Sequence, residues 1–520
     1  MSHRLPTPAV FALLLVLAPL TVVAQDDLGA ALSLQNTFTR VIEEAEGSVV
    51  SISRAKVRSA NEPQIEQFDR RMPDRLEDQI KSPDFIPNAF GTGIVVDKNG
   101  LILTAYHVVR GGPIDQSTEA PSQLLYVRLA DRRGFNARIY AADPRSDLAV
   151  LKIDATDLKP MRFDGPQEPP KRGQFVIGLG NPYAIARDGS ASASWGIIAN
   201  VGRRDDTADK ELDDFEQGKR QTIHHLGTLL QLDMRLDLGT SGAPVLNLRG
   251  ELVGMTTSLA AIAGYEKSAG FAIPLDGRMK RIIEALVNGQ EVEYGFLGIS
   301  MPSNVTVEML ERVRAVVPVD GAARFRDVVG NSPAKDRLER DDLLLFIRRK
   351  GEPVSERRPI RGQSDVMREV GLLPPGETVV FDIWRNNQLQ TVDVQLGKWP
   401  VLDDEGIVAT RRPPGWRGLR VDHATARNRY MPERDLNFNR RVLDDRSVPP
   451  IPAGVLVTEV DAQSVAGQTE IRPGDLIERV NRQPVSNLRQ FQELIKGLDP
   501  AMPVTLSLSN DRTIQLPAEQ

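Results

Sequence analysis

The sequence predicts a mainly β protein in which an all-β sandwich or a pair of barrels is followed by two smaller α+β domains. Between Gly91 and Thr256, short β-like runs recur at high density and are bounded by Gly, Asp, Asn and Pro, which is typical of sandwiches and barrels. Residues 295–400 and 415–517 instead combine strands with one or two short helices each. The two stretches open on similar turns, Gly295-Phe-Leu-Gly-Ile299 and Gly415-Trp-Arg-Gly-Leu419, which indicates a repeat on the scale of a small domain.

The overall composition is ordinary for a globular protein of several domains. The chain has 520 residues, of which 41% are hydrophobic and 26% are charged, so a sizeable core can be buried. Lys and Arg number 65 against 70 Asp and Glu, for a net charge of -5. This near-balance of charge produces no positive electrostatic field that would attract nucleic acid, so no nucleic-acid partner is expected. The absence of cysteine excludes disulfides, thiol nucleophiles and Cys-based metal sites.

The N-terminus carries an apolar run that predicts export. After Arg4 the run extends from Ala9 to Ala18 and meets Pro19, so it is shorter than the about 20 apolar residues that a bilayer span needs. Small residues at Val22 and Ala24 suit a signal peptidase, and we expect residues 1–24 to be a cleavable signal peptide. An uncleaved membrane anchor is the alternative.

The next stretch, residues 25–290, is expected to fold as one β-rich domain. Residues 25–45 have the apolar spacing of a short helix, and residues 49–53 read as the first strand. Residues 54–88 and 202–222 are polar and lack a sustained period, which predicts exposed loops. An apolar helical period over residues 279–286 predicts the helix that ends the domain.

A serine lies in a glycine-rich turn, Gly239-Thr-Ser-Gly-Ala-Pro244. Glycine at 239 allows a tight turn in which its N–H and that of Ser241 converge on one spot. Two such donors can hold the oxyanion of a tetrahedral intermediate, so residues Gly239, Thr240 and Ser241 are the predicted oxyanion turn. Taken alone, this segment fits an ordinary Gly-rich β-turn equally well.

A histidine and an aspartate that could activate this serine stand at strand ends. His107 follows the β-like run that starts at Leu101, and Asp147 immediately precedes the apolar run from Leu148. A serine hydroxyl needs a base to take its proton, and a buried carboxylate can fix the imidazole tautomer. The order His107, Asp147, Ser241 is one of the orders in which such catalytic triads occur.

Several segments together resemble the HtrA (Deg) family of trypsin-like serine proteases with C-terminal PDZ domains. They are Leu103-Thr-Ala-Tyr-His-Val-Val109, Ser146-Asp-Leu-Ala-Val-Leu-Lys152, Gly178-Leu-Gly-Asn-Pro-Tyr183, Gly239-Thr-Ser-Gly-Ala-Pro244 and Gly270-Phe-Ala-Ile-Pro274. The resemblance implies a trypsin-like double β-barrel over 25–290, an irregular PDZ-like domain over 295–400, and a second PDZ domain over 415–517 with an insertion near 422–450. It also implies a homotrimer or a multiple of one, a periplasmic location, and no metal or organic cofactor.

The serine turn departs from the family pattern at three positions. Thr240 stands where Asn is usual, Ala243 where a second Gly is usual, and Arg235 where the family has a small apolar residue. Position 235 lies at the base of the substrate pocket in trypsin-like folds, so an inward Arg235 would favour an acidic substrate residue. The alternative, which we favour, is that Arg235 points to solvent.

Substrate is expected to bind as an added β-strand beside residues 255–258, which makes Thr256, Thr257 and Ser258 predicted binding residues. In the PDZ-like stretches the predicted carboxylate-binding loops are Phe296-Leu297-Gly298 and Trp416-Arg417-Gly418. In the first stretch Asp341 stands where Gly is usual, and Asp adopts such a turn less readily. Either module could alternatively serve only as a packing unit.

The expected function is therefore a serine endoprotease that degrades or processes unfolded or damaged proteins in the cell envelope, with PDZ domains that bind peptide segments or C-termini. The competing interpretation is a proteolytically idle, chaperone-like or peptide-binding scaffold on the same fold. Labelling of Ser241 by an active-site probe separates the two.

Overall fold

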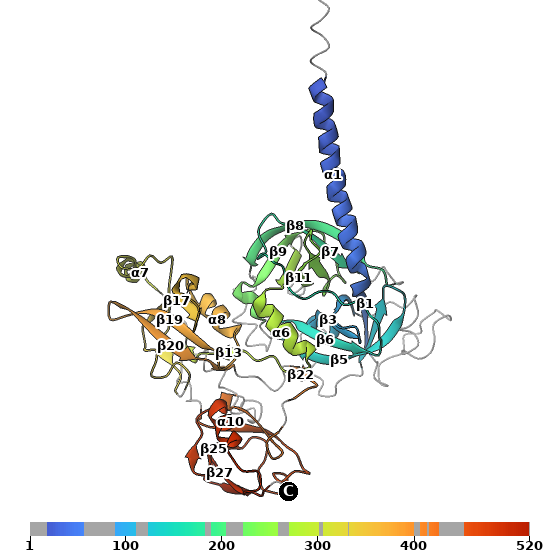
Figure 1. The fold of residues 1–520 in the computed structure, drawn as a ribbon. Coiled ribbons are helices and arrows are strands. Elements are labelled where there is room, and N and C mark those ends of the chain that lie inside the picture. Colours follow the sequence, from blue (N-terminus) through green and yellow to red (C-terminus); the bar gives the residue numbers. More distant parts are fainter. Residues whose placement is uncertain are drawn as a thin grey trace, which may run out of the picture.

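The computed structural model describes residues 18–56, 89–110, 123–181, 189–203, 222–257, 270–300, 305–330, 332–399, 406–412, 415–425 and 452–518. Two β-barrels lie together at the centre, a long N-terminal helix projects from them, and two smaller units built on sheets follow (Figure 1). The expectations for 57–88, 204–221 and 426–451 lie outside the described residues.

The first barrel contains β1 (Val49–Lys56), β2 (Ala89–Val95), β3 (Leu101–Ala105), β4 (Gln123–Leu129), β5 (Gly134–Asp143) and β6 (Leu148–Ile153). These strands pair in the order β5-β4-β1-β2-β3-β6, and a further pairing of β5 with β6 closes them. The inward positions are mainly β-branched and leucine side chains such as Ile52, Ile94 and Val150, which are almost fully buried. Such residues favour pleated, buried strands.

The second barrel contains β7 (Phe175–Gly180), β8 (Ser192–Arg203), β9 (Leu229–Asp233), β10 (Pro244–Leu246), β11 (Leu252–Thr257) and β12 (Gly270–Pro274). It is closed in the order β10-β11-β12-β9-β8-β7. Two closed antiparallel barrels confirm the predicted double β-barrel and exclude the sandwich.

Helices lie around these barrels. They are α1 (Ala18–Ala45), η1 (Glu46–Ser48), α3 (Tyr106–Arg110), η3 (Ile223–Leu226) and α6 (Gly277–Val287). In α6 the Asp276 side chain accepts hydrogen bonds from the N–H groups of Arg278 and Met279, which caps the free donors of the first turn. The helix predicted over residues 25–45 begins earlier, at Ala18. Within the described residues, no helix has both the length and the apolar character needed to cross a bilayer.

The middle unit is built on β15 (Ala323–Arg324), β17 (Leu343–Arg349), β19 (Thr378–Arg385) and β20 (Gln388–Gln395), with β18 (Arg358–Pro359) paired to β17. Its other elements are β13 (Gly295–Phe296), β14 (Ile299–Ser300), α7 (Val307–Arg314), β16 (Asp327–Val328), η4 (Val354–Glu356), α8 (Gln363–Gly371) and β21 (Gly397–Lys398). The buried side chains of Phe325 and Phe381 lie in its separate core.

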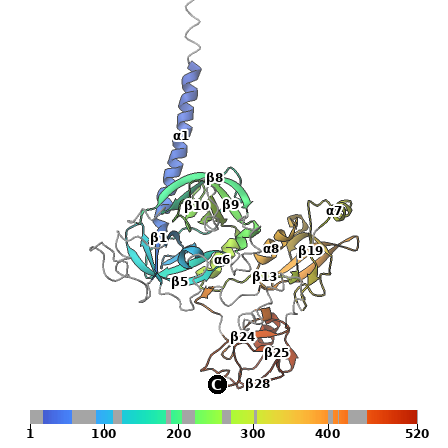
Figure 2. The same ribbon diagram turned by 180° about the vertical axis from the view of Figure 1, so that it is seen from behind.

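Within its described residues, the C-terminal unit consists of a single sheet and one α-helix. It contains β23 (Leu419–His423), β24 (Val455–Val460), β25 (Leu476–Val480), β26 (Gln483–Pro484), α10 (Leu488–Lys496), β27 (Val504–Leu508) and β28 (Thr513–Leu516). Phe491 of α10 is buried against the sheet and contacts Trp416 edge-on. Both smaller units therefore have the α+β composition that the sequence predicts, and the view from behind shows them below and beside the barrels (Figure 2).

Residues 400–414 are charged and end in two prolines, which predicts a linker between the two smaller units, but two of these residues form a strand. β22 (Val408–Ala409) pairs with Ala142 and Ala141 of β5 and so extends the sheet of the first barrel. The linker prediction is wrong for these two residues. The backbone of these two residues is hydrogen-bonded to β5, which is distant in sequence. A polar sequence that ends in proline gives no indication of such pairing.

Candidate active site

His107 and Asp147 are in direct contact. His107 lies on α3, immediately after β3, and Asp147 immediately precedes β6, the strand that pairs with β3. The His107 Nδ1 atom lies 3.0 and 2.9 Å from the two Asp147 carboxylate oxygens. The backbone N–H of His107 also donates to Asp147 Oδ1, at 3.1 Å. Since a carboxylate accepts, Nδ1 carries the proton and Nε2 remains able to take one.

The turn around Ser241 depends on two glycines with positive φ. Gly239 has φ 96° and Gly242 has φ 88°, a region that favours glycine. A Cβ on Gly239 would lie 2.4 Å from the Asn181 carbonyl oxygen, and one on Gly242 would lie 2.1 Å from the Thr92 carbonyl oxygen. Both the conformation and the available space therefore exclude a side chain at these positions.

Backbone contacts tie the serine turn to the His107–Asp147 pair. The Ser241 carbonyl accepts from the Thr92 N–H at 2.8 Å. Gly242 donates to the Thr256 carbonyl at 2.9 Å. The next residue, Thr257, donates its hydroxyl to Asp147 Oδ2 at 3.1 Å. One strand, β11, thus contacts both the serine turn and the aspartate.

The two family departures inside the turn are accommodated. The Thr240 hydroxyl donates to the Asp237 carbonyl at 2.7 Å, and the Thr240 N–H donates to the same oxygen at 3.1 Å. Ala243 is buried, and its N–H donates to Thr256 Oγ1 at 3.0 Å. Because the Thr240 N–H is engaged inside the turn, Gly239 and Ser241 are the better candidates for oxyanion donors.

Two of the predicted substrate-binding residues, Thr256 and Thr257, already make hydrogen bonds within the protein. The Thr256 N–H donates to the Ala243 carbonyl at 2.8 Å, and its carbonyl accepts from Gly242, so both backbone groups are engaged. The Thr257 hydroxyl binds Asp147. Ser258 lies outside the described residues. The structure thus assigns Thr256 to the support of the serine turn, which differs from the binding role expected from the sequence.

Arg235 points away from the site. Its side chain is 80% exposed, and its Nε donates to Asp237 Oδ2 at 2.7 Å. This agrees with the favoured alternative of a solvent-facing arginine and removes the basis for an acidic substrate preference.

Behind Asp147 lies a histidine that the sequence did not single out. His224 is fully buried, and its Nε2 lies 2.8 Å from the Ser146 carbonyl. A carbonyl only accepts, so Nε2 carries the proton and Nδ1 accepts from the Thr228 hydroxyl at 2.9 Å. Burial lowers the pKa of His224 below its usual value, so this imidazole is neutral at pH 7. Its position in a polar loop gave no sign of this role.

The two predicted carboxylate-binding loops differ in their surroundings. Phe296 and Leu297 are buried, and Phe296 contacts Trp399 in a cluster with Leu456 and Leu476 of the C-terminal unit. Gly298 has φ 80°.

In the C-terminal unit, Gly418 has φ 82°. Trp416 and Leu419 exchange backbone hydrogen bonds of 2.8 Å, and Arg417 is buried. The C-terminal loop is thus tight and ordered by its own backbone hydrogen bonds, while Phe296 at the start of the middle loop is covered.

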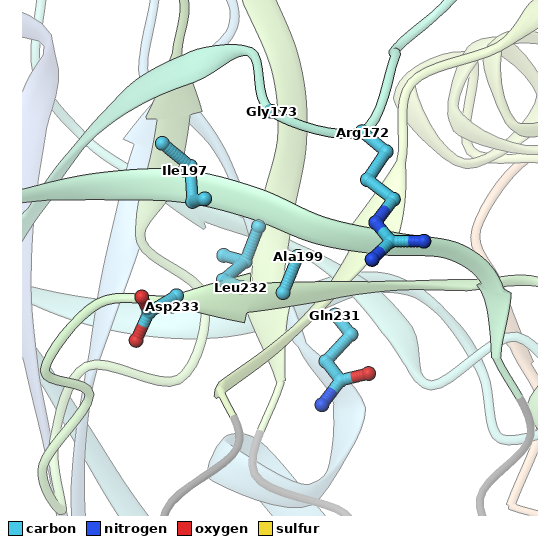
Figure 3. A pocket seen from close by; sticks show the side chains of 7 residues that line it. All are labelled: Arg172, Gly173, Ile197, Ala199, Gln231, Leu232 and Asp233. Atoms are coloured by element: carbon cyan, nitrogen blue, oxygen red, sulfur yellow. The ribbon is translucent and has the colours of Figure 1, made fainter.

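A shallow pocket of about 690 Å³ lies on the outside of the second barrel, between β8 and β9 (Figure 3). Its lining residues are Arg172, Gly173, Ile197, Ala199, Gln231, Leu232 and Asp233. None of the predicted catalytic residues lines it, so it is separate from the candidate active site.

Comparison with known proteins finds similar domains and similar whole chains. A trypsin-like peptidase domain matches residues 91–255, and a PDZ domain matches residues 456–506. A Halomonas elongata protein named probable periplasmic serine endoprotease DegP-like is 28% identical over 488 residues, with 90% of each chain covered. A protein of the same name from Pseudomonas putida is 26% identical over 495 residues, with 91% of each chain covered. The solved serine endoprotease from Yersinia pestis is similar with a TM-score of 0.41 and 22% identity, over 69% of this chain and 97% of that one.

The peptidase match contains His107, Asp147 and Ser241, and the PDZ match lies in the C-terminal unit. The resemblance stated from the sequence is thereby confirmed. The chain thus resembles the HtrA (Deg) family of trypsin-like serine proteases along nearly its whole length, through two closed barrels, a matching peptidase domain and a C-terminal PDZ domain.

Proposed function

We propose that this serine endoprotease cleaves unfolded or damaged proteins in the cell envelope, with His107, Asp147 and Ser241 as its catalytic triad. The observation that carries the residue assignment is the paired contact of His107 Nδ1 with both Asp147 oxygens. An idle scaffold does not require this arrangement, and no observation favours that alternative.

The chemistry follows from the positions of the protons. His107 Nε2 takes the proton of the Ser241 hydroxyl as its oxygen attacks the substrate carbonyl, and Asp147 stabilises the imidazolium. The N–H groups of Gly239 and Ser241 hold the oxyanion, each worth about 3 kcal/mol of barrier. The imidazolium then protonates the leaving amine, and the same residues activate water to release the acyl group.

The proposal also includes export of the chain and cleavage of residues 1–24. It sets the domain limits at 25–290, 295–400 and 415–517, and it assigns peptide binding to the smaller units. The apolar N-terminal run supports export, and the relatives quoted above carry the word periplasmic in their names. Substrate is proposed to reach the triad as an extended strand. The covered Phe296 favours the C-terminal unit as the peptide-binding module and the middle unit as a packing module.

Assembly into a trimer or a multiple of one is supported by an exposed aromatic cluster. Phe38 of α1 lies 5.5 Å from Trp195 of β8 and 6.4 Å from Phe175 of β7, measured between ring centroids. Trp195 is 61% exposed. A cluster of aromatic rings open to solvent is typical of an interface between proteins.

The experiment is digestion of casein by the wild type and by Ser241→Ala, with the mass of the assembly measured in the same preparation. We expect the variant to lose at least about 10³-fold in rate while its assembly is unchanged, because the nucleophile is absent. Ser192→Ala, an exposed serine on β8, is the matched control and should cleave as the wild type does. Undiminished cleavage by Ser241→Ala would contradict the proposal.

A further inference from the structure

The turn that carries Asp147 is held in an unusual conformation. It connects β5 and β6, and Asp147 has φ 55°. A non-glycine residue in this region is uncommon and persists only where its surroundings fix it. The Asp147 N–H makes only a long hydrogen bond, 3.4 Å, to the Pro144 carbonyl. Other groups must therefore hold the turn.

One of those groups is the buried carboxylate of Asp143 at the start of the turn. It accepts from the Ser146 N–H at 3.0 Å and also from the Ser146 hydroxyl. Its third donor is the phenol of Tyr294. Tyr294 lies far along the chain, in the segment that leads from α6 into the middle unit, and it is 5% exposed. The turn thus depends on a residue from outside the barrels.

The neighbouring Arg145 inserts into the same segment. Its guanidinium lies 4.5 Å from the ring centroid of Tyr294 and 4.5 Å from that of Trp399. A cation between two aromatic faces is attracted by both. A Cβ on Gly371 of α8 would lie 3.5 Å from the Arg145 side chain, so the middle unit closes over this site.

The opposite side of the turn is fixed within the protease. His224 binds the Ser146 carbonyl, and the Ile223 N–H donates to the Arg145 carbonyl at 2.8 Å. The turn is therefore held between η3 on one side and Tyr294 on the other, both of which are distant from it in sequence.

We propose that Tyr294, acting through Asp143, is a positioning residue for the catalytic Asp147. The proposal rests on the triad proposed above. The Tyr294 phenol keeps Asp143 bound to Ser146, this fixes the turn, and the turn places the Asp147 carboxylate against His107. Tyr294 touches no reacting atom, so its loss should lower turnover and leave substrate binding intact.

The charged groups around Asp143 set the expected pH dependence. Arg145 faces it from its own turn, Arg281 from α6, and Tyr294 from the segment after α6. Burial raises the pKa of Asp143 above its usual value, and the donors Ser146 and Tyr294 partly oppose that rise. Loss of the phenol should therefore raise this pKa further, and the defect should grow as the pH falls.

The test uses the full-length Tyr294→Phe variant with a fluorogenic casein substrate. We expect kcat to fall between about tenfold and one hundredfold with KM within about twofold, as when catalytic geometry loosens. The ratio to wild type should decrease further at acidic pH. The matched control is Tyr126→Phe, which removes the phenol of a different buried tyrosine, on β4 of the first barrel, and should retain full kcat.

Asp143→Asn and the double variant complete a thermodynamic cycle. If Tyr294 acts through Asp143, the double variant should lose little more than the more severe single variant. A folded Tyr294→Phe with wild-type kcat, a change confined to KM, or a loss in the double variant equal to the product of both single losses would each overturn the proposal. Ser241→Ala separates this outcome from failure of the triad, because its loss does not depend on Tyr294.

Discussion

At the scale of single residues, Gly239 and Gly242 decide whether the serine turn can form. Both have a positive φ, and neither has room for a Cβ because carbonyl oxygens lie too close. A side chain at either position requires the backbone to move, and the N–H groups of the turn would move with it.

The Gly239→Ala substitution should impair catalysis more than folding. We expect a loss of about 10²-fold or more in kcat, since one proposed oxyanion donor is displaced, and a lower thermal midpoint from backbone strain of about 1–3 kcal/mol. Steady-state kinetics and thermal unfolding measure the two effects. Gly277→Ala is the control, because a Cβ there meets open space at the start of a helix. Equal kcat in both variants would contradict the assignment.

The sequence was sufficient to single out His107, Asp147 and Ser241, because strand ends and a glycine turn leave local signals. The structure brings His107 against Asp147 and connects both to the serine turn through β11. His224 and Tyr294 could not be found in this way. Their partners are distant in sequence, and a buried histidine in a polar loop has no periodic pattern around it.

At the scale of elements, the loop before β23 is fixed from within by one arginine. Arg417 is 3% exposed, with φ 52°. Its guanidinium donates to the carbonyls of Pro517, Asp499, Pro500 and Met502, at 2.8, 3.2, 3.0 and 2.7 Å. One side chain therefore joins the proposed carboxylate loop to the segments that flank β27 and β28.

Arg417→Ala should loosen this loop selectively. Buried carbonyls that lose a charged donor cost about 1–3 kcal/mol each when left unsatisfied, so amide hydrogen exchange should accelerate across residues 415–419 and 499–503. Protection in the first barrel should not change. Arg489→Ala removes an exposed pair with Glu493 on α10 and should leave exchange in the loop as it is. Unaltered protection in Arg417→Ala would show that the loop is held by other contacts.

Elements with a long regular pattern were predicted well, and short ones were not. Residues 487–495 have a helical period in the sequence, which predicts a helix, and the structure has α10 there, capped by Asn487. Strand β22 was missed because two residues paired to a distant strand carry no periodicity. The turn at Asp341 was expected to be less favourable than with glycine. It has φ 73°, and its carboxylate binds Arg324 at 2.6 Å.

At the scale of the whole molecule, Lys398 joins three parts of the chain. Its Nζ is 2.7 Å from Asp422 of β23, and 3.0 and 3.1 Å from Glu293 and Glu291 after α6. Lys398 itself ends the middle unit and is 2% exposed. Burial opposes its charge, but the carboxylates outweigh burial and raise its pKa. It is therefore charged at neutral pH.

Lys398→Met should release the C-terminal unit. Breaking a buried ion pair costs about 3–5 kcal/mol when its partners stay charged. Trypsin should therefore cut the junction, the segment between the middle and C-terminal units, faster. The radius of gyration in solution scattering should increase. Lys350→Met removes an exposed partner of Asp393 and should change neither measurement. If both variants behave alike, Lys398 does not hold the junction.

Acidification should act on the same junction in the wild type. Burial opposes the charge of Asp422, but Lys398 outweighs it and lowers the pKa of Asp422. The pair therefore contributes stability above the ordinary Asp pKa, and this contribution is lost as the pH falls through the lowered value. The Lys398→Met variant should lack this acid sensitivity.

Strand β22 has a consequence for how the chain is made. The ribosome releases β5 early, whereas Val408 and Ala409 emerge only after the middle unit is complete. The sheet of the first barrel therefore gains its last strand late in synthesis, and pairing across such a separation is slow. Ala142, a partner of β22, directly precedes Asp143. A first barrel whose six other strands have already formed therefore lacks one neighbouring strand, directly beside the turn of Asp143, until residues 408 and 409 have been synthesised.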